Sequence, residues 1–394
     1  MKVLWLCSWY PNELDPFDGD FVERHAKALS LYAEVYVIHV VQNHEWLQGK
    51  EYKEQVLENG NLQVQTVILP FPDTGLSIWN KLIFNNRYQK NLKEQLRRYI
   101  RNHGKPDLVH VHVPVKAGAG ALWLKKNFNV PFVVTEHTSA YFEDIPFHYA
   151  SRNIYFRYVT RKTFKEALAV SSVSDWLLKR LKELFQLQQT RLIRNTVDTS
   201  LFYPVQRSNT DVTRFLHVSM MVPLKNVTGI LQAFLQLQQK RTDWELVLAG
   251  PAPEEIRQHV QVSGLQNKVS FTGALSYAEV ALQMQQADAL VHFSKYENLP
   301  CVINEALCCG MPVISSDVGG ISELVNESNG ILVKEGDCNS LAAALDFFMD
   351  NRHTFHNESI AAAAQQQYGF HVTGRELIRF YESLLPGTNP SVLQ

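Results

Sequence analysis

Short apolar runs alternate with longer, helix-like segments along almost the whole chain, and this alternation starts again near its middle. The first half contains VLWL at 3–6, EVYVIHV at 34–40 and DLVHVHV at 107–113. The second half contains RFLHVSM at 214–220 and WELVLAG at 244–250. Short apolar runs separated by helical segments are typical of parallel sheets that are covered by helices on both faces. The pattern therefore predicts two Rossmann-like, doubly wound α/β domains.

A chain of 394 residues is longer than one ordinary hydrophobic core supports, so two domains are expected. A polar, unpatterned stretch near residues 200–213 separates the two series of runs. We predict a first domain over residues 1–200 and a second over 201–370. Residues 371–394 contain HVTGRELIRFYESLL, which predicts an amphipathic helix that returns to the first domain. We expect the domains to face a central cleft, with ligands at the carboxyl ends of the strands.

Charge is divided unevenly between the halves, although the formal net charge is only −1. Residues 1–200 carry 26 Lys and Arg against 20 Asp and Glu, a balance of +6. The remainder carries 12 against 19, a balance of −7. A basic first half favours contact with an anionic partner or a membrane surface, with uneven surface decoration as the alternative.

The cysteines and the hydropathy pattern exclude several protein classes. The five cysteines lack the paired spacing of a zinc site or a disulfide framework, and the adjacent Cys308 and Cys309 are interpreted as packing residues. The apolar run in MKVLWLCSWYP is too short for a signal peptide and predicts a buried strand. No stretch reaches the ~20 apolar residues of a membrane span. These features predict a cytoplasmic protein whose membrane contact, if any, is peripheral.

The segment SKYENLPCVINEALCCGMPV, at 294–313, combines two carboxylates with a helix start. Pro300 suits the first turn of a helix, which places Glu305 on the helix and Glu297 on the loop before it. Eight helical residues span ~12 Å, more than the roughly 5–9.5 Å between the carboxyl pairs of glycosidases. Two carboxylates that accept hydroxyl hydrogen bonds, with a phosphate-binding helix end between them, predict a nucleotide-sugar site. The alternative is a loop charge and an ordinary helix residue.

The stretch ENLPCVINEALCCGMPVISSDVGGISEL resembles the E-x7-E block and the following GG loop of glycosyltransferase family 4, the group 1 glycosyltransferases. Other pieces resemble the family in order and spacing: SWYPNELDPFDGDFVERHAKAL, PDLVHVHV, TEHTSAY, LIRNTVDTSLFYP, HVSMMVPLKN, LVLAGP and VSFTGAL. The resemblance implies the GT-B fold and a retaining transfer from a UDP- or GDP-sugar to a saccharide or lipid-linked acceptor. It also implies a place in cell-surface polysaccharide or glycolipid biosynthesis.

The resemblance assigns roles to individual residues. Glu297 matches the glutamate that steadies the transferred sugar, Lys225 the lysine that neutralises the leaving diphosphate, and His137 a strand-end histidine near the donor sugar and the acceptor. Glu305 matches the glutamate that holds the ribose hydroxyls, and Gly19 the glycine loop that faces the diphosphate. The implied catalytic residues are Glu297, His137 and Lys225. The implied donor-binding residues are Gly19, Ser219, Lys225, Phe271, Gly273, Asn298, Leu299, Cys301, Val302 and Glu305.

The chain departs from the family pattern at three places. Met220 follows Ser219 where the family often has arginine, so Lys225 neutralises the diphosphate either alone or with help from Arg24 or Arg194. Pro300 stands where the family often has glycine, which removes one N–H donor. Arg194 and Thr196 replace a common proline and glycine around Asn195.

Two motifs offer rival sites. Asp18 and Asp20 form a D-x-D pattern that suits Mg²⁺ or Mn²⁺. The E-x7-E type of enzyme works without metal, so we expect neither a metal nor a cofactor, and the nucleotide-sugar is a substrate. GAGAL at 118–122 is similar to part of a dinucleotide fingerprint, but Trp123 replaces its third glycine.

Residues 79–101 predict one helix with an apolar face and a basic face. The basic face is either the solvated exterior of a crossover helix or a contact with an anionic membrane, and nucleic acid is not an expected partner. Two other functions stay open at this point. One is a nucleotide-sugar epimerase of the same fold, and the other is a non-catalytic protein that binds sugar nucleotides.

Overall fold

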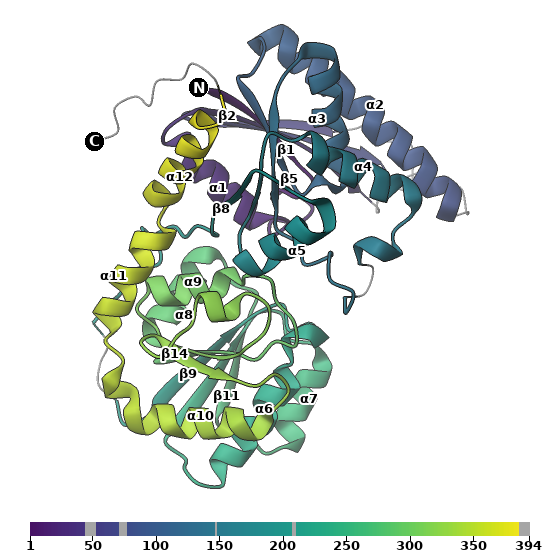
Figure 1. Ribbon diagram of the computed structural model, residues 1–394. Helices are drawn as coiled ribbons and strands as arrows, with labels where there is room; N and C mark the ends of the chain where they lie inside the picture. Colours follow the sequence, from purple (N-terminus) through teal and green to yellow (C-terminus); the bar gives the residue numbers. More distant parts are fainter. Residues whose placement is uncertain (44–52, 71–76, 146–147, 207–209, 386–394) are drawn as a thin grey trace. The chain divides into compact units, whose positions relative to one another are not determined.

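The computed structural model describes residues 1–43, 53–70, 77–145, 148–206 and 210–385. The chain forms two compact units (Figure 1). Unit 1 comprises Met1–Arg194 together with Phe370–Gln394, and unit 2 comprises Asn195–Gly369. Residues 386–394 of the predicted C-terminal segment lie outside the described part of the chain.

Unit 1 is built on an eight-stranded sheet in the order β3-β4-β2-β1-β5-β6-β7-β8. Neighbouring strands are parallel, apart from the antiparallel edge pair of β3 and β4. The chain order reverses between β1 and β5, where doubly wound sheets bind ligands. The strands are β1 Lys2–Cys7, β2 Glu34–Asn43, β3 Lys53–Asn59, β4 Leu62–Pro70, β5 Leu108–His112, β6 Phe132–Glu136, β7 Val170–Ser172 and β8 Thr190–Leu192.

Helices cover both faces of this sheet and bury a core on each side. One face packs against α1 and α12, and the other packs against α2, α3, α4 and α5. The α12 helix follows the whole of unit 2 in the sequence and still packs against α1 in unit 1 (Figure 1), as predicted. The two helices approach closely, because a Cβ at Gly374 would lie 2.2 Å from the carbonyl oxygen of Ala28. The helices are α1 Asp20–Ser30, α2 Ser77–His103, α3 Pro114–Phe128, α4 Ile154–Glu166, α5 Asp175–Phe185 and α12 Phe370–Glu382, with a 3-10 turn at Tyr149–Ser151.

Unit 2 contains a six-stranded parallel sheet in the order β11-β10-β9-β12-β13-β14. This is the order of a Rossmann sheet, with its reversal between β9 and β12. The strands are β9 Thr213–Val218, β10 Trp244–Ala249, β11 Val269–Gly273, β12 Ala289–His292, β13 Val313–Ser316 and β14 Gly330–Val333. The helices are α6 Val227–Gln238, α7 Glu254–Val262, α8 Tyr277–Gln286, α9 Cys301–Cys308, α10 Cys338–Asn351 and α11 Asn357–Tyr368, with 3-10 turns at Pro223–Lys225, Ile321–Glu323 and Arg352–Thr354.

Two Rossmann-like α/β domains were predicted, and the two sheets confirm them. Besides the runs named above, the sequence predicts strands at PFVVTEH, ALAVSSVS, TRLIRN, KVSFTG, DALVHFS and PVISSD. The strands β3, β4 and β14 match none of the predicted strands. β3 is an edge strand whose side chains are almost all exposed, so it lacks an apolar run. The register of β3 with β4 leaves the two-residue loop Gly60–Asn61. A Gly-Asn pair between two extended runs is a sequence feature from which this hairpin could have been predicted.

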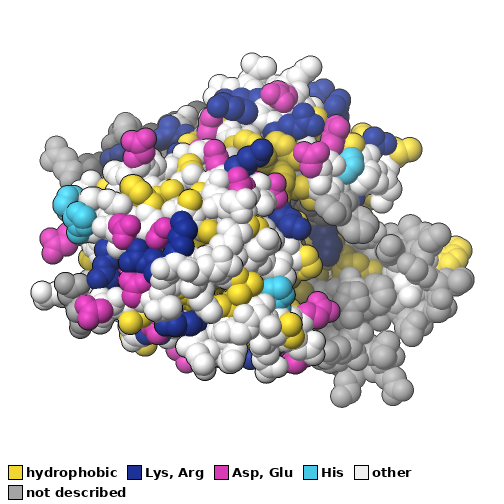
Figure 2. All heavy atoms as spheres, turned by 90° about the horizontal axis from the view of Figure 1, so that it is seen from below, with side chains coloured by type: hydrophobic (Ala, Val, Ile, Leu, Met, Phe, Trp, Pro, Cys, Tyr) yellow, Lys and Arg dark blue, Asp and Glu magenta, His cyan; other side chains and the backbone are white. Residues whose placement is uncertain are grey.

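The predicted helix over 79–101 is part of α2, and its apolar face is buried at Phe84, Tyr88, Leu92 and Leu96. The basic face is exposed, but Arg98 forms an ion pair with Glu54 at 2.8 Å. On the face of the molecule that Figure 2 shows, basic and acidic side chains are interspersed. Among the described residues, no helix combines the length and the apolar character that crossing a membrane requires.

Candidate active site

The site in unit 2 forms where the loops after β9 and β12 meet, at the reversal of the strand order. Lys225 lies at the end of a 3-10 turn after β9, and Glu297 lies in the loop after β12. The Nζ atom of Lys225 donates to Oε1 of Glu297 at 2.5 Å. His292, the last residue of β12, donates from Nε2 to the same oxygen at 2.9 Å. A carboxylate with two cationic or polar donors therefore marks the position at which Rossmann sheets bind their ligands.

The environment keeps Glu297 ionised. Burial opposes its ionisation, but hydrogen bonds and charge from His292 and Lys225 outweigh that effect and lower the pKa of Glu297 from 4.5 to about 2. A carboxyl group whose pKa is lower in the folded than in the unfolded protein stabilises the fold fully above its unfolded-state pKa. This contribution is lost as the pH falls through its folded-state pKa. Glu297 thus stabilises unit 2 above about pH 4.5, and this contribution disappears as the pH approaches 2.

Ser219 shapes the turn that carries Lys225. The Nδ1 atom of His217 donates to the carbonyl oxygen of Val291 at 2.8 Å, and burial lowers the pKa of His217 to about 3. His217 is therefore neutral, and its Nε2 accepts from the Ser219 hydroxyl at 2.7 Å. That hydroxyl in turn accepts from the N–H of Met221 at 2.9 Å. The Ser219 side chain is engaged within the turn, and the neighbouring Met220 is 58% exposed.

Gly319 allows the GG loop to lie against the backbone of Glu297. Its φ is +58°, and a Cβ there would lie 1.9 Å from the carbonyl oxygen of Glu297. The N–H of Gly320 donates to the carbonyl oxygen of Asn298 at 2.9 Å. The GG loop and the Glu297 loop therefore hold each other in place.

Replacing Gly319 with alanine is expected to displace the Glu297 backbone. We expect a loss of about 2–3 kcal/mol of unfolding free energy and at least ~10-fold of glycosyl transfer. Gly264→Ala is the matched control, because Gly264 has a φ of +71° but a Cβ there meets no atom within 4 Å. Denaturant unfolding and product formation measure both effects. Equal losses in the two variants would show that backbone strain alone, and not contact with Glu297, makes Gly319 necessary.

The α9 helix begins at Cys301, with Pro300 as its N-cap. The sequence prediction placed Pro300 within the first turn, so the helix starts one residue later than predicted. The N–H groups of Cys301 and Val302 belong to the first turn, which has no internal hydrogen-bond acceptors for them. Glu305, one turn further along, is only 5% exposed.

The remaining donor-binding residues predicted in unit 2 lie on β11 and in the loop before α9. The carbonyl oxygen of Leu299 accepts from the side chain of Asn195 at 2.9 Å, which fixes the loop before α9. Phe271 lies on β11, where the guanidinium of Arg257 is 4.7 Å from the centre of its ring. Gly273 ends the same strand with a φ of +75°, and its carbonyl oxygen accepts from Gly250 at 2.9 Å.

His137 and Gly19 belong to unit 1. His137 directly follows β6 and is 8% exposed, and its Nε2 lies 3.1 Å from Nδ1 of His112. Burial, together with the charges of His25 and His110, holds the pKa of His137 well below its ordinary value, so the ring is neutral. Gly19 is the N-cap of α1 with a φ of +67°, and a Cβ there would lie 2.6 Å from the backbone of Trp9.

The two carboxylates of the D-x-D motif contact different residues. Asp20 forms an ion pair with Arg24 at 3.2 Å, whereas Oδ2 of Asp18 lies 3.9 Å from Nε2 of His39. Among the residues that the structure describes, no group of three or more His, Cys, Asp or Glu side chains is placed to hold a metal ion. Arg24, one of the cations considered as a substitute at the diphosphate, is engaged with Asp20.

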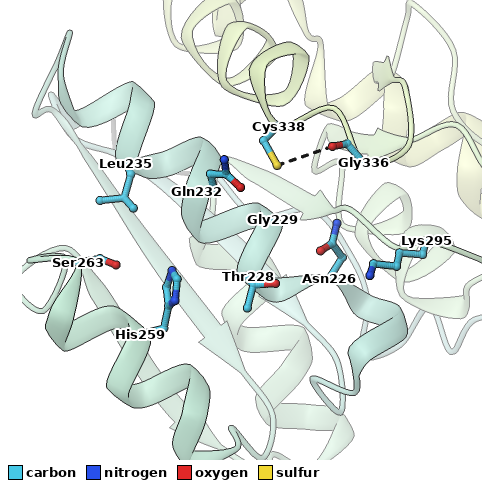
Figure 3. A pocket seen from close by; sticks show the side chains of 10 residues that line it. All are labelled: Asn226, Thr228, Gly229, Gln232, Leu235, His259, Ser263, Lys295, Gly336 and Cys338. Atoms are coloured by element: carbon cyan, nitrogen blue, oxygen red, sulfur yellow. Dashed lines mark hydrogen bonds between the residues drawn. The ribbon is translucent and has the colours of Figure 1, made fainter.

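Unit 2 also has a surface hollow of about 470 Å³ that extends over α6 toward α7 and the start of α10 (Figure 3). The residues that line it include the polar side chains of Thr228, Gln232, His259 and Lys295. Neither Glu297 nor Lys225 lines it. None of the residues predicted from the sequence lines the hollow, although its lining includes Asn226, which follows Lys225, and Lys295, which precedes Glu297 by two positions.

Two histidines of this site, His217 and His292, are absent from the sequence predictions. Both lie in apolar strands and are fully buried. The sequence feature that could have indicated them is a histidine near the carboxyl end of each strand that borders the reversal point, in RFLHVSM and DALVHFS. A polar side chain in such a run either needs a buried partner or contributes to a site.

Two family descriptions match adjacent stretches of the chain. "Glycosyltransferase Family 4" matches residues 33–201, and "Glycosyl transferases group 1" matches residues 201–367. The chain belongs to the group 1 glycosyltransferases. It is therefore an enzyme that transfers glycosyl groups, and its two Rossmann-like domains form the GT-B fold.

Relatives of this glycosyltransferase differ in their named substrates. It is 24% identical over 365 residues to the "Putative teichuronic acid biosynthesis glycosyltransferase TuaC" of Bacillus subtilis, covering 88% of each chain. It is 24% identical over 298 residues to the alpha-D-kanosaminyltransferase of Streptomyces kanamyceticus, covering 70% of this chain and 77% of that one.

Solved structures share the fold of this glycosyltransferase at low sequence identity. Sucrose-phosphate synthase from Thermosynechococcus elongatus has a TM-score of 0.75 at 20% identity, covering 98% of this chain and 99% of that one. Anabaena HepE in complex with UDP has a TM-score of 0.69 at 18% identity, covering 97% of this chain and 100% of that one. HepE has also been solved with UDP-glucose.

Proposed function

We propose that this glycosyltransferase moves a sugar, with retention of configuration, from a UDP- or GDP-sugar to a saccharide or lipid-linked acceptor. The observation that carries the proposal is the contact of Lys225 and His292 with Glu297 at the reversal point of unit 2. UDP in complexes of HepE supports a nucleotide donor, and the name of TuaC supports a role in cell-surface polysaccharide or glycolipid biosynthesis.

The charges of the site account for its proposed chemistry. Lys225 pairs with Glu297 in the free protein, and the diphosphate of a bound donor competes for the same ammonium group. Negative charge develops on the diphosphate as the glycosidic bond breaks, so a fixed cation stabilises the transition state more than the ground state. Glu297 is then left to steady the transferred sugar, while the first turn of α9 and Glu305 hold phosphate and ribose.

His137 is the proposed contribution of unit 1 to the reaction. As a neutral ring it acts as a hydrogen-bond partner for the donor sugar and the acceptor, because burial disfavours its charged form. In the proposal His112 fixes the orientation of this ring through the 3.1 Å contact. The proposed reaction uses no metal ion and no cofactor, and it takes place at the cytoplasmic side of a membrane.

Donor identity is tested by thermal shift against a panel of UDP-, GDP- and other nucleotide-sugars, followed by assay of released nucleoside diphosphate. We expect one donor to raise the unfolding temperature and to be turned over when a membrane extract is added. The configuration of the first-formed sugar, measured by NMR, is expected to match that of the donor. An inverted first product would contradict retention, and an isomerised donor without acceptor would indicate an epimerase.

A further inference from the structure

The start of α4 presents large apolar side chains at the surface of unit 1. Ile154 is 78% exposed, Tyr155 64% and Tyr158 61%. Single exposed apolar residues are common on protein surfaces, but a contiguous group indicates an interaction site. These three residues lie within four positions of one helix and therefore form such a group.

Helical spacing extends this group into a continuous stripe. Positions three, four and seven apart in a helix share one face. The opposite face of α4 is buried at Thr160, Thr163 and Phe164. We call the exposed stripe the α4 face, and it consists of Ile154, Tyr155, Tyr158, Arg161, Lys162 and Lys165.

The charge of the α4 face is entirely positive. Residues 149–165 include five Lys or Arg and no Asp or Glu. Two of the nearest acidic side chains along the chain are already paired: Glu166 contacts Lys125 at 3.4 Å, and Glu143 contacts Arg180 at 3.7 Å. The other, Asp144, precedes the helix by ten residues. The Nζ atom of Lys162 lies 5.9 Å from the centre of the Tyr158 ring, so the basic and aromatic parts adjoin.

Topology places the apolar end of this face beside the proposed acceptor side of unit 1. The α4 helix connects the parallel strands β6 and β7, so it starts at the carboxyl edge of the sheet. His137 follows β6 at that same edge. The α2 helix also starts there, on the same face of the sheet as α4 (Figure 1), and its Trp79 is 58% exposed.

We propose that the α4 face docks unit 1 on the headgroup region of a bilayer rich in anionic lipid. Tyrosine suits this region because its ring is apolar and its hydroxyl is polar, and clustered Lys and Arg are attracted by anionic headgroups. A polysaccharide or nucleic acid could use the tyrosines and the cations, but neither offers an apolar medium for Ile154. The purpose of the docking rests on the proposed function, since it brings a lipid-linked acceptor toward His137.

Vesicle sedimentation of the full chain tests this surface without turnover. We expect binding to vesicles of phosphatidylglycerol and phosphatidylcholine, little binding to phosphatidylcholine alone, and a loss of binding between about 0.1 and 0.5 M salt. The variant Ile154→Ser/Tyr155→Ser/Tyr158→Ser should bind roughly tenfold more weakly. Arg161→Gln/Lys162→Gln should bind about as weakly and with a smaller salt dependence. Leu282→Ser/Phe347→Ser removes two residues of unit 2 that are 53% and 56% exposed, and should bind like the wild type.

Three results would overturn the proposal. The first is a wild-type protein that does not bind the anionic vesicles. The second is a loss of vesicle binding in the unit 2 control that equals the loss in the α4 variants. The third is light scattering that finds a wild-type dimer and a monomeric triple variant, which would make the α4 face an interface between copies. Binding of the nucleotide-sugar, measured by thermal shift without membranes, should be the same in all variants. Its absence with every variant and donor would count against the proposed function and not against the docking surface.

Discussion

Replacing Glu297 with alanine is expected to lower glycosyl transfer by roughly 10³-fold at saturating donor. The carboxylate is the common partner of Lys225 and His292, and its pKa of about 2 keeps it charged at every working pH. Without it, the transferred sugar loses the negative group proposed to steady it as positive charge develops. The measurement is the rate of nucleoside diphosphate release with donor and membrane extract.

The matched variant is Glu297→Gln, which keeps one side-chain oxygen and the shape of the side chain but removes its charge. It should lose nearly as much activity as the alanine variant, because the charge matters more than the hydrogen bonds. Both variants should keep the secondary structure and cooperative unfolding of the wild type, since Lys225 is 26% exposed and can turn to solvent. Full activity in either variant would rule out the site assignment.

Lys225→Ala is expected to lower turnover by roughly 10²- to 10³-fold, because the leaving diphosphate loses the cation proposed to neutralise it. In the proposal the chain depends more on this one lysine, because Met220 stands where the family often supplies an arginine. Lys225→Arg keeps the charge with a different geometry and should recover part of the rate. Initial rates over a range of donor concentrations separate the effect on turnover from the effect on donor binding.

The same substitution is expected to change the titration of Glu297. Lys225 is one of the groups that lower this pKa, so its removal should raise the value from about 2 toward 4.5. Carbon NMR of the labelled carboxyl group measures the change. An unchanged pKa together with unchanged turnover would show that the contact between Lys225 and Glu297 has no influence on the site.

Much of the fold follows from hydropathy, because the central strands are largely buried and appear as short, mainly apolar runs. β1, β2 and β5 illustrate this, and each was predicted from such a run. β3 could not be found in this way, since an exposed edge strand needs few apolar side chains. The return of α12 to unit 1 follows from its amphipathic pattern, whereas its close contact at Gly374 depends on the three-dimensional path of α1.

The site was less accessible from the sequence alone. Lys225 and Glu297 are 72 positions apart, and only the strand order brings them together. Resemblance to the family assigned both residues to one site, which neither residue type nor spacing predicts, but it did not predict their contact. His292 was missed because a buried histidine in an apolar strand is usually structural. The roles of Phe271 and Gly273 in donor binding, and of Glu305 toward ribose, stay predictions.

The most direct test is release of nucleoside diphosphate from a nucleotide-sugar, with membrane extract present, by wild type and Glu297→Gln side by side. We expect release by the wild type from at least one UDP- or GDP-sugar, and nearly none by the variant, although a thermal shift shows that both bind the donor. Equal release by both proteins, or none by the wild type from any nucleotide-sugar, would contradict this expectation.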